Sequence, residues 1–201
     1  MDEAGGIGLA APQIAVSKQL AIIRLDDSSE RYPGIESSPE YIMFNPVINY
    51  LTQETQGHWE GCLSVPGLRG YVERPSKIAV NYIDENLESN TLNLDGFLAT
   101  VFQHEIDHLF GKLYIDRVFN KELIMYEDEF LKSLHRELAR VLHPDLNKNA
   151  NDDEFKKMQA AYEVGDAAVL ISMASDPELI SSSLSDIIIS PGIILNLYLI
   201  G

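Results

Sequence analysis

The sequence predicts an α+β fold in which short antiparallel strands surround one central helix and an α-helical hairpin is appended. Three observations favour this fold. Residues 1–119 carry short β-prone runs between glycines and prolines, residues 95–110 change to a helical apolar period, and residues 120–170 have the pattern of two helices joined by a polar loop. We therefore expect a first domain at 1–119, a helical hairpin at 120–170 and a tail of unknown structure at 171–201.

The first domain is expected to contain short strands. Residues 19–25 form an apolar run typical of a buried strand, and residues 41–50 contain another run around Asn45 and Pro46. Residues 77–83 alternate and meet a polar turn at 84–86, so residues 91–94 can return as the second strand of a hairpin.

Residues 95–110 are expected to form the central helix, which ends at Gly111. Its apolar side chains recur at steps of three and four residues. They are Phe97, Leu98, Val101, Phe102, Ile106 and Leu109. A second helix is expected at 123–142, broken by His143-Pro144-Asp145, and a third at 153–164, ended by Gly165.

The charge balance excludes some partners. The 201 residues include 31 acidic and 15 basic side chains, so the formal charge is −16, which argues against a nucleic acid and against an anionic membrane surface. The longest apolar stretch, 187–200, is broken by Ser190-Pro191-Gly192, so we expect no membrane span. Cys62 is the sole cysteine, which excludes an intrachain disulfide and fits a reducing compartment.

His104-Glu105-Ile106-Asp107-His108 is the strongest chemical signal in the chain. On a helix, positions i and i+4 share a face, so both imidazoles can reach one metal ion. Glu105, about 100° around the helix from His104, can contact a water without being a ligand. The alternative is that the two histidines have no ligand role, but this apolar helix belongs in a core, where such groups need a metal or hydrogen-bond partners.

A catalytic metal site needs a third protein ligand and an open position. Asp116 and Glu122 lie downstream, and Cys62 lies upstream in the segment 60–67 (EGCLSVPG). A lone cysteine is more often a small buried apolar residue. As a thiolate, however, Cys62 would complete a Cys/His/His set suited to iron(II) or zinc.

Residues 5–13 (GGIGLAAPQ) form a glycine-rich loop. No Lys-Ser/Thr pair follows and the spacing is not GxGxxG, so phosphate binding is disfavoured. Small residues also let a backbone approach a ligand closely, and Gln13 offers an amide donor beside that backbone.

Three segments, in this order, resemble the motifs of peptide deformylases: GIGLAAPQ at 6–13, EGCLSVPG at 60–67 and QHEIDHLFGKLYIDR at 103–117. The resemblance covers residues 1 to about 118. It implies a metallohydrolase that removes the formyl group from the N-terminal formylmethionine of nascent polypeptides, near the ribosome exit region. It further implies a bacterial-type cytoplasmic enzyme, or an organellar one if the natural start lies upstream.

The resemblance implies a role for each matching residue. Cys62, His104 and His108 would hold one divalent metal ion, with Fe²⁺ as the usual metal and Zn²⁺ or Ni²⁺ as replacements. Glu105 would be the general base and then the proton donor, while Gln13 and the backbone N–H of Leu63 would hold the oxyanion.

It also implies substrate contacts. Ile7 and Gly8 would pair with the peptide backbone, Arg69 would stand near the peptide mouth, and Glu60 would orient a metal ligand. The methionine pocket would be lined by Phe97, Thr100 and Val101, of which Thr100 is more polar than expected.

The chain departs from the family before its first motif. The family normally has several dozen earlier residues, including a helix, whereas Met1 stands close to the motif here. We expect a domain lacking this N-terminal helix, with uncovered apolar surface that would lower stability and activity.

Residues 123–165 resemble helices II and III of a J-domain, through the order helix, His143-Pro144-Asp145, polar loop, helix. The resemblance implies a heat-shock ATPase chaperone as partner, bound through these three residues, although the usual first helix has no room. A J-domain-type co-chaperone fragment on an inactive deformylase scaffold is therefore the alternative function. HExxH alone also suggests a metallopeptidase, against which Cys62 argues, since such enzymes usually use a further His or Glu.

Overall fold

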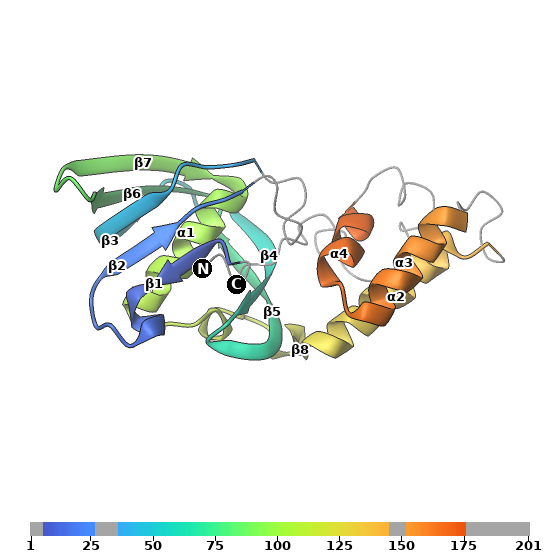
Figure 1. The fold of residues 1–201 in the computed structure, drawn as a ribbon. Helices are drawn as coiled ribbons and strands as arrows, with labels where there is room; N and C mark the ends of the chain where they lie inside the picture. Colours follow the sequence, from blue (N-terminus) through green and yellow to red (C-terminus); the bar gives the residue numbers. More distant parts are fainter. Residues whose placement is uncertain (1–5, 27–35, 145–151, 176–201) are drawn as a thin grey trace.

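The computed structural model describes residues 6–26, 36–144 and 152–175. Figure 1 shows a strand-rich part built around helix α1 and, beside it, a group of three helices. The strands are β1 (Gly8–Ala10), β2 (Leu20–Ile23), β3 (Tyr41–Tyr50), β4 (Thr55–Cys62), β5 (Val65–Pro75), β6 (Lys77–Ile83), β7 (Ser89–Asp95) and β8 (Ile124–Tyr126). The helices are α1 (Gly96–Leu109), α2 (Glu127–Leu142), α3 (Asp152–Val164) and α4 (Ala167–Ser175). Short 3₁₀ helices span Ala11–Ile14, Tyr114–Asp116 and Lys121–Leu123.

The strands form two antiparallel sheets. One has the order β1-β2-β3-β6-β7 and the other the order β4-β5-β8. Helix α1 lies between them and buries an unbroken run of side chains from Ala99 to His108. Because α1 is covered on all sides along this run, its histidines and acids are held in the interior rather than on a solvated face.

The predicted α+β fold is confirmed. The strands expected at 41–50 and 77–83 match β3 and β6, and the hairpin expected at 91–94 is the β6–β7 pair, which extends over Ser89–Asp95. The central helix begins and ends within one residue of the expected range, with Gly111 at a φ of +69° just after it. Glycine adopts this left-handed conformation without the steric cost other residues meet.

The β4–β5 hairpin is absent from the sequence-based prediction. Residues Thr55–Cys62 pair with Val65–Pro75, with Glu60 opposite Gly70 and Cys62 opposite Val65, and the register shifts between Glu60 and Cys62. Positions 57–62 are all buried although they include a histidine and a glutamate. Alternation of apolar and polar residues therefore could not reveal this strand.

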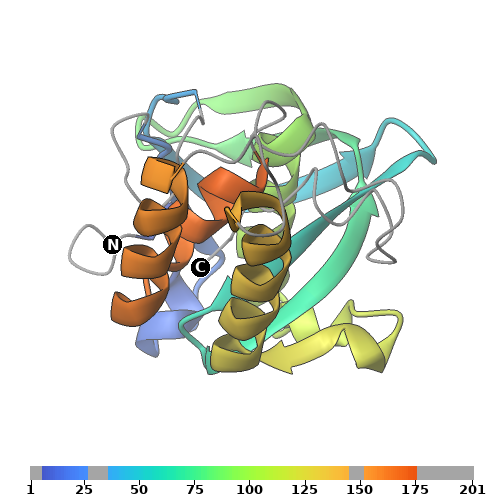
Figure 2. The same cartoon turned by 90° about the vertical axis from the view of Figure 1, so that its right-hand side faces the viewer.

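Helices α2, α3 and α4 pack against one another, and Figure 2 shows them facing the viewer. Residues 124–126 of the expected helix 123–142 instead form β8, which pairs with β5, and α2 begins at Glu127. Phe130 of α2 packs against Trp59 of β4 at a ring-centroid distance of 5.2 Å, so the helices share one core with the strands.

The helical part continues past residue 170, since α4 runs to Ser175. His143 follows α2 and contacts the ring of Phe155, whereas Asp145 and the expected tail beyond 175 lie outside the described residues. The three-part division of the chain stays a prediction. Among the helices of the described ranges, none is long and apolar enough to cross a membrane.

Candidate metal centre

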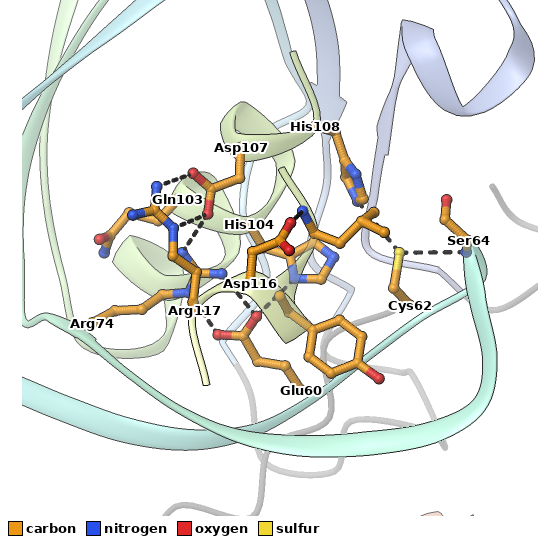
Figure 3. A network of polar contacts seen from close by, with 12 residues as sticks. Glu60, Cys62, Ser64, Arg74, Gln103, His104, Asp107, His108, Asp116 and Arg117 are labelled. Carbon is orange, nitrogen blue, oxygen red and sulfur yellow. Dashed lines mark hydrogen bonds and ion pairs between the residues drawn. The ribbon is translucent and has the colours of Figure 1, made fainter. Parts of the chain in front are cut away.

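Cys62, His104 and His108 come together although Cys62 and His104 are 42 positions apart in the sequence. Cys62 ends β4, next to the register shift, and the two histidines lie one turn apart on α1. One ligand atom from each residue lies within 4.8 Å of the others, and all three residues are buried. Figure 3 shows the thiol and the two rings converging from these elements. Neither Asp116 nor Glu122 belongs to the group.

The His104 ring is oriented by a carboxylate. Its Nδ1 lies 2.8 Å from Oε2 of Glu60, and its Nε2 is buried without a hydrogen-bond partner among the described residues. Burial lowers the pKa of His104, but the neighbouring Cys62 sulfur and Glu60 carboxylate outweigh it and raise the pKa to about 10. An imidazole that is anchored through one nitrogen can present the other nitrogen to a metal ion, which is the usual arrangement of metal-binding histidines.

The Cys62 thiol is stabilised as a thiolate. Its Sγ lies 3.3 Å from Nε2 of His108 and accepts the Ser64 backbone N–H at 3.4 Å and Nε2 of Gln13 at 3.6 Å. Burial raises the pKa of Cys62, but the neighbouring His104 and His108 imidazoles outweigh it and lower the pKa to about 5. The thiolate is the form that binds metals.

Glu105 lies beside this group without a partner for its Oε2 atom among the described residues. It is buried, and this burial raises the pKa of its carboxyl, although the histidines act in the opposite direction. A carboxylate with a raised pKa can accept and return a proton near neutral pH.

Gly8 of β1 makes room for Glu105. A Cβ atom at Gly8 would lie 2.5 Å from the Glu105 carboxyl, so any side chain there must push this acid aside. We expect Gly8→Ala to lower kcat of the activity proposed below by about 10²-fold, because a shift of about 1 Å in a catalytic group can cost this much. Gly165→Ala, which strains a residue at φ +73° far from the site, serves as control and should lower the melting temperature while leaving kcat unchanged.

Gln13 is held in one orientation. Its Oε1 accepts the Ala10 N–H at 2.8 Å, and its Nε2 therefore faces Cys62 and Ser64, donating to Ser64 Oγ at 3.3 Å. Leu63 and Ser64 form the two-residue turn between Cys62 and Val65, and the Leu63 side chain is exposed. The amide of Gln13 and the turn at Leu63 thus both adjoin the thiol.

A chain of buried charges supports the site from behind. Arg74 donates to both oxygens of Glu60 at 2.6 and 2.9 Å and to Asp107 at 2.9 Å, and Asp107 also accepts from Arg117 (Figure 3). Burial raises the pKa of Glu60, but Arg74 outweighs it and the pKa falls to about 2. Glu60 is therefore ionised when it orients His104.

Arg74 holds this buried charge network together. We expect Arg74→Met to lower the free energy of unfolding by about 3–5 kcal/mol, because it leaves a buried carboxylate without its main partner. Urea denaturation measures this loss. The double variant Arg74→Met/Glu60→Gln should recover part of it, and a double variant no more stable than the single would contradict the explanation.

A cavity of about 230 Å³ adjoins Cys62. It is lined by Cys62, Leu63, Val65, Pro66, Gly67, Leu68, Arg69 and Glu127. Arg69 is thus at the site, but its guanidinium is buried and paired with Glu127 at 2.5 Å. Ile7 is buried, and its carbonyl accepts the Arg24 N–H at 3.0 Å.

The residues expected to form the methionine pocket do not line this cavity. Thr100 and Val101 are fully buried, and Phe97 contacts the ring of His58. The polarity of Thr100 has an explanation, because its hydroxyl accepts a hydrogen bond from Gln56 at 2.8 Å. Their part in substrate binding stays a prediction.

Sequence reasoning missed Arg74, Asp107, Ser64 and Glu127. Asp107 carries a weak signal, since it lies three residues after His104 on the same helix. Arg74 carries none, because only the hairpin register brings it next to Glu60, 14 residues away.

The buried Cys/His/His group, the carboxylate beside it and the amide of Gln13 define a metal-dependent hydrolase site. The sequence profile described as "Polypeptide deformylase" matches residues 1–124. The chain therefore belongs to the peptide deformylase family, whose members are metallohydrolases that remove the formyl group from N-terminal methionine.

Individual relatives support this family assignment. The peptide deformylase of Leptospira biflexa is 50% identical over 129 residues, which are 64% of this chain and 72% of that protein. A peptide deformylase of Synechococcus elongatus in complex with actinonin has a TM-score of 0.52 and 43% identity, and the match covers 59% of each chain. A Met-Ala-Ser-bound peptide deformylase from Acinetobacter baumannii has a TM-score of 0.55 and 39% identity, over 59% of this chain and 74% of that one. The chain thus spans less than two thirds of the Synechococcus protein.

Proposed function

We propose that this chain hydrolyses the N-terminal formyl amide of formylmethionyl peptides. The observation that carries the proposal is the convergence of Cys62, His104 and His108 beside an unpartnered Glu105 carboxylate oxygen. This combination would provide three metal ligands and a base, with one coordination position left for solvent. The membership of the chain in the peptide deformylase family supports the same reaction.

The residues fit a divalent metal ion. The Nε2 of His104 is buried without a hydrogen-bond partner among the described residues, and the thiol of Cys62 is stabilised as a thiolate. When bound, the metal polarises the formyl oxygen and lowers the pKa of a water. A set of one sulfur and two imidazole nitrogens suits iron(II), zinc or nickel, and we propose Fe²⁺ as the native ion.

Glu105 is the proposed general base. Its carboxylate accepts a proton from the attacking water as the C–O bond forms at the formyl carbon. It then returns that proton to the departing amine when the C–N bond breaks, so that formate and a free N-terminal amine result. Its raised pKa suits it to both steps.

Gln13 and the Leu63 backbone N–H are the proposed donors to the oxyanion. Negative charge develops on the former formyl oxygen, and donors fixed in advance stabilise it without reorganisation. Gln13 meets this requirement because its own carbonyl is held by the Ala10 N–H, which keeps the NH₂ group at the thiol.

The peptide is proposed to add a strand beside β1. This strand is at the edge of its sheet and pairs only with β2 among the described strands. An edge strand presents main-chain groups to an extended peptide, and Ile7 and Gly8 start that edge next to Glu105. Phe97, Thr100 and Val101 are proposed for the methionine side chain.

Hydrolysis of formyl-Met-Ala-Ser by the full chain, loaded anaerobically with Fe²⁺, tests the proposal. We expect release of formate from formyl-Met-Ala-Ser, no release of acetate from acetyl-Met-Ala-Ser, and no cleavage of internal peptide bonds. Removal of the metal by a chelator should abolish the reaction and re-addition should restore it. Cleavage of internal bonds instead would indicate a metallopeptidase and contradict the proposal.

We further propose action on nascent chains in the cytoplasm, near the ribosome exit. A chaperone partner for residues 123–165 stays a prediction, since the family match ends at residue 124. His143 is half-buried against Phe155. If it contacts a chaperone, His143→Gln will reduce stimulation of the chaperone's ATPase. No stimulation by the unmodified chain would exclude that partner.

A further inference from the structure

Glu127 is a site residue that belongs to the helical part of the chain. It is the first residue of α2 and lies beyond the family match, which ends at residue 124. Nevertheless it lines the same cavity as Cys62. The pairing of β8 with β5 explains this position, since Arg69 lies opposite Met125 in the register, and Glu127 follows two residues later.

Its partner Arg69 is embedded in the wall beside the metal ligands. A Cβ atom at Gly61 would collide with the Arg69 guanidinium, so this cation lies flat over the backbone next to Cys62. Only 7% of the Arg69 side chain is exposed, against 39% for Glu127. The cation is thus enclosed by the wall, and the acid is the member of the pair that faces solvent.

This arrangement fixes the charge of the cavity. Arg69 is the one basic residue among those lining it, and Glu127 is the one acid. With both present the lining is neutral; without Glu127 it would carry a buried cation. A buried guanidinium binds a carboxylate strongly because its hydrogen bonds are charge-assisted and poorly screened.

We infer that Glu127 determines the charge preference of the cavity beside Cys62, which we call the peptide mouth. Glu127 pairs with Arg69 and so prevents this guanidinium from binding a carboxylate of the peptide. The inference rests on the proposed function, because it takes the cavity as the place where the residues after methionine lie. A nascent chain carries no terminal carboxylate close to its formylmethionine, so a neutral mouth suits long peptides better than free short ones.

Calorimetric titration of the metal-loaded full chain with Met-Ala-Ser and with its C-terminal amide tests the inference. The two peptides differ only in one terminal charge. The measured quantity is the Kd of the amide divided by the Kd of the free acid. We expect Glu127→Gln to raise this ratio about three- to tenfold, since a charge-assisted contact replaces a neutral one.

Glu129→Gln is the matched control. Glu129 also lies in the first turn of α2, and the substitution removes the same charge without touching Arg69. Glu129→Gln should leave the ratio of the two Kd values within about twofold of that of the unmodified chain, because exposed charges at a distance are screened. Glu127→Asp, which retains the charge at the helix start but shortens the side chain, should give an intermediate ratio and serves if Glu127→Gln folds poorly.

The outcomes are distinct. An unchanged ratio in Glu127→Gln would show that Glu127 only stabilises the start of α2, and would overturn the inference. Equal increases in Glu127→Gln and Glu129→Gln would overturn it too, as a general charge effect. Binding of neither peptide by the unmodified chain would reject the cavity as a peptide mouth, while formate release from formyl-Met-Ala-Ser would still report on the proposed reaction.

Discussion

Glu105→Gln is expected to lower kcat by about 10²–10⁴-fold, which is the usual contribution of a positioned general base. Glutamine retains the shape of the side chain but cannot accept a proton from water. The substitution should leave the metal content unchanged, because Glu105 is outside the Cys62/His104/His108 group. It also replaces a buried carboxylate that lacks a partner for its Oε2 among the described residues, so stability should not fall.

Two measurements on the same preparation separate the possible roles of Glu105. Elemental analysis reports the metal per chain, and formate release from formyl-Met-Ala-Ser gives kcat and KM. Loss of kcat with full metal content supports the role of a base. If metal were lost together with activity, Glu105 would be a ligand, and the assignment of the base would be refuted. Glu105→Asp, which retains the acid one methylene further back, should recover part of the rate.

The parts of the fold that sequence predicts are those whose apolar side chains recur at regular steps. These steps are two residues in the β6–β7 hairpin and three or four residues in helix α1. β4 and β5 escape prediction because their buried positions include Glu60 and Arg74, which are tolerated in the interior only as a pair. That pairing depends on a register between residues 14 apart, which no local pattern encodes.

The residues of the candidate site also fall into those that sequence predicts and those that it does not. His104, Glu105 and His108 are visible because one helix places them at a fixed spacing, and Cys62 is visible because it is the sole cysteine. Arg74 and Glu127 reach the site only through strand pairing. Their residue types are those of any solvated surface, so sequence alone gives no reason to select them.

Cys62→Ala is expected to weaken metal binding by more than about 100-fold, with loss of activity to match. Even the loss of a partner behind a ligand costs about 10- to 100-fold in affinity, so the loss of a ligand itself should cost more. Equilibrium dialysis against Zn²⁺ measures the affinity. Cys62→Asp is the informative companion, because a carboxylate beside two imidazoles forms another common catalytic zinc set, and it should retain part of the binding.

If Cys62→Ala retained its metal, two explanations would be possible, and a second variant separates them. The Oε2 of Glu105 has no hydrogen-bond partner among the described residues and lies beside the ligand group, so this carboxylate can move into the position that sulfur leaves. Glu60 cannot substitute in this way, because Arg74 and His104 hold its two oxygens. Metal retained in Cys62→Ala but lost in Cys62→Ala/Glu105→Gln would therefore identify Glu105 as the replacement. Metal retained in both variants would mean that the Cys62 thiolate is not a ligand. The proposed site would then be wrong, and a different residue would have to be the third ligand.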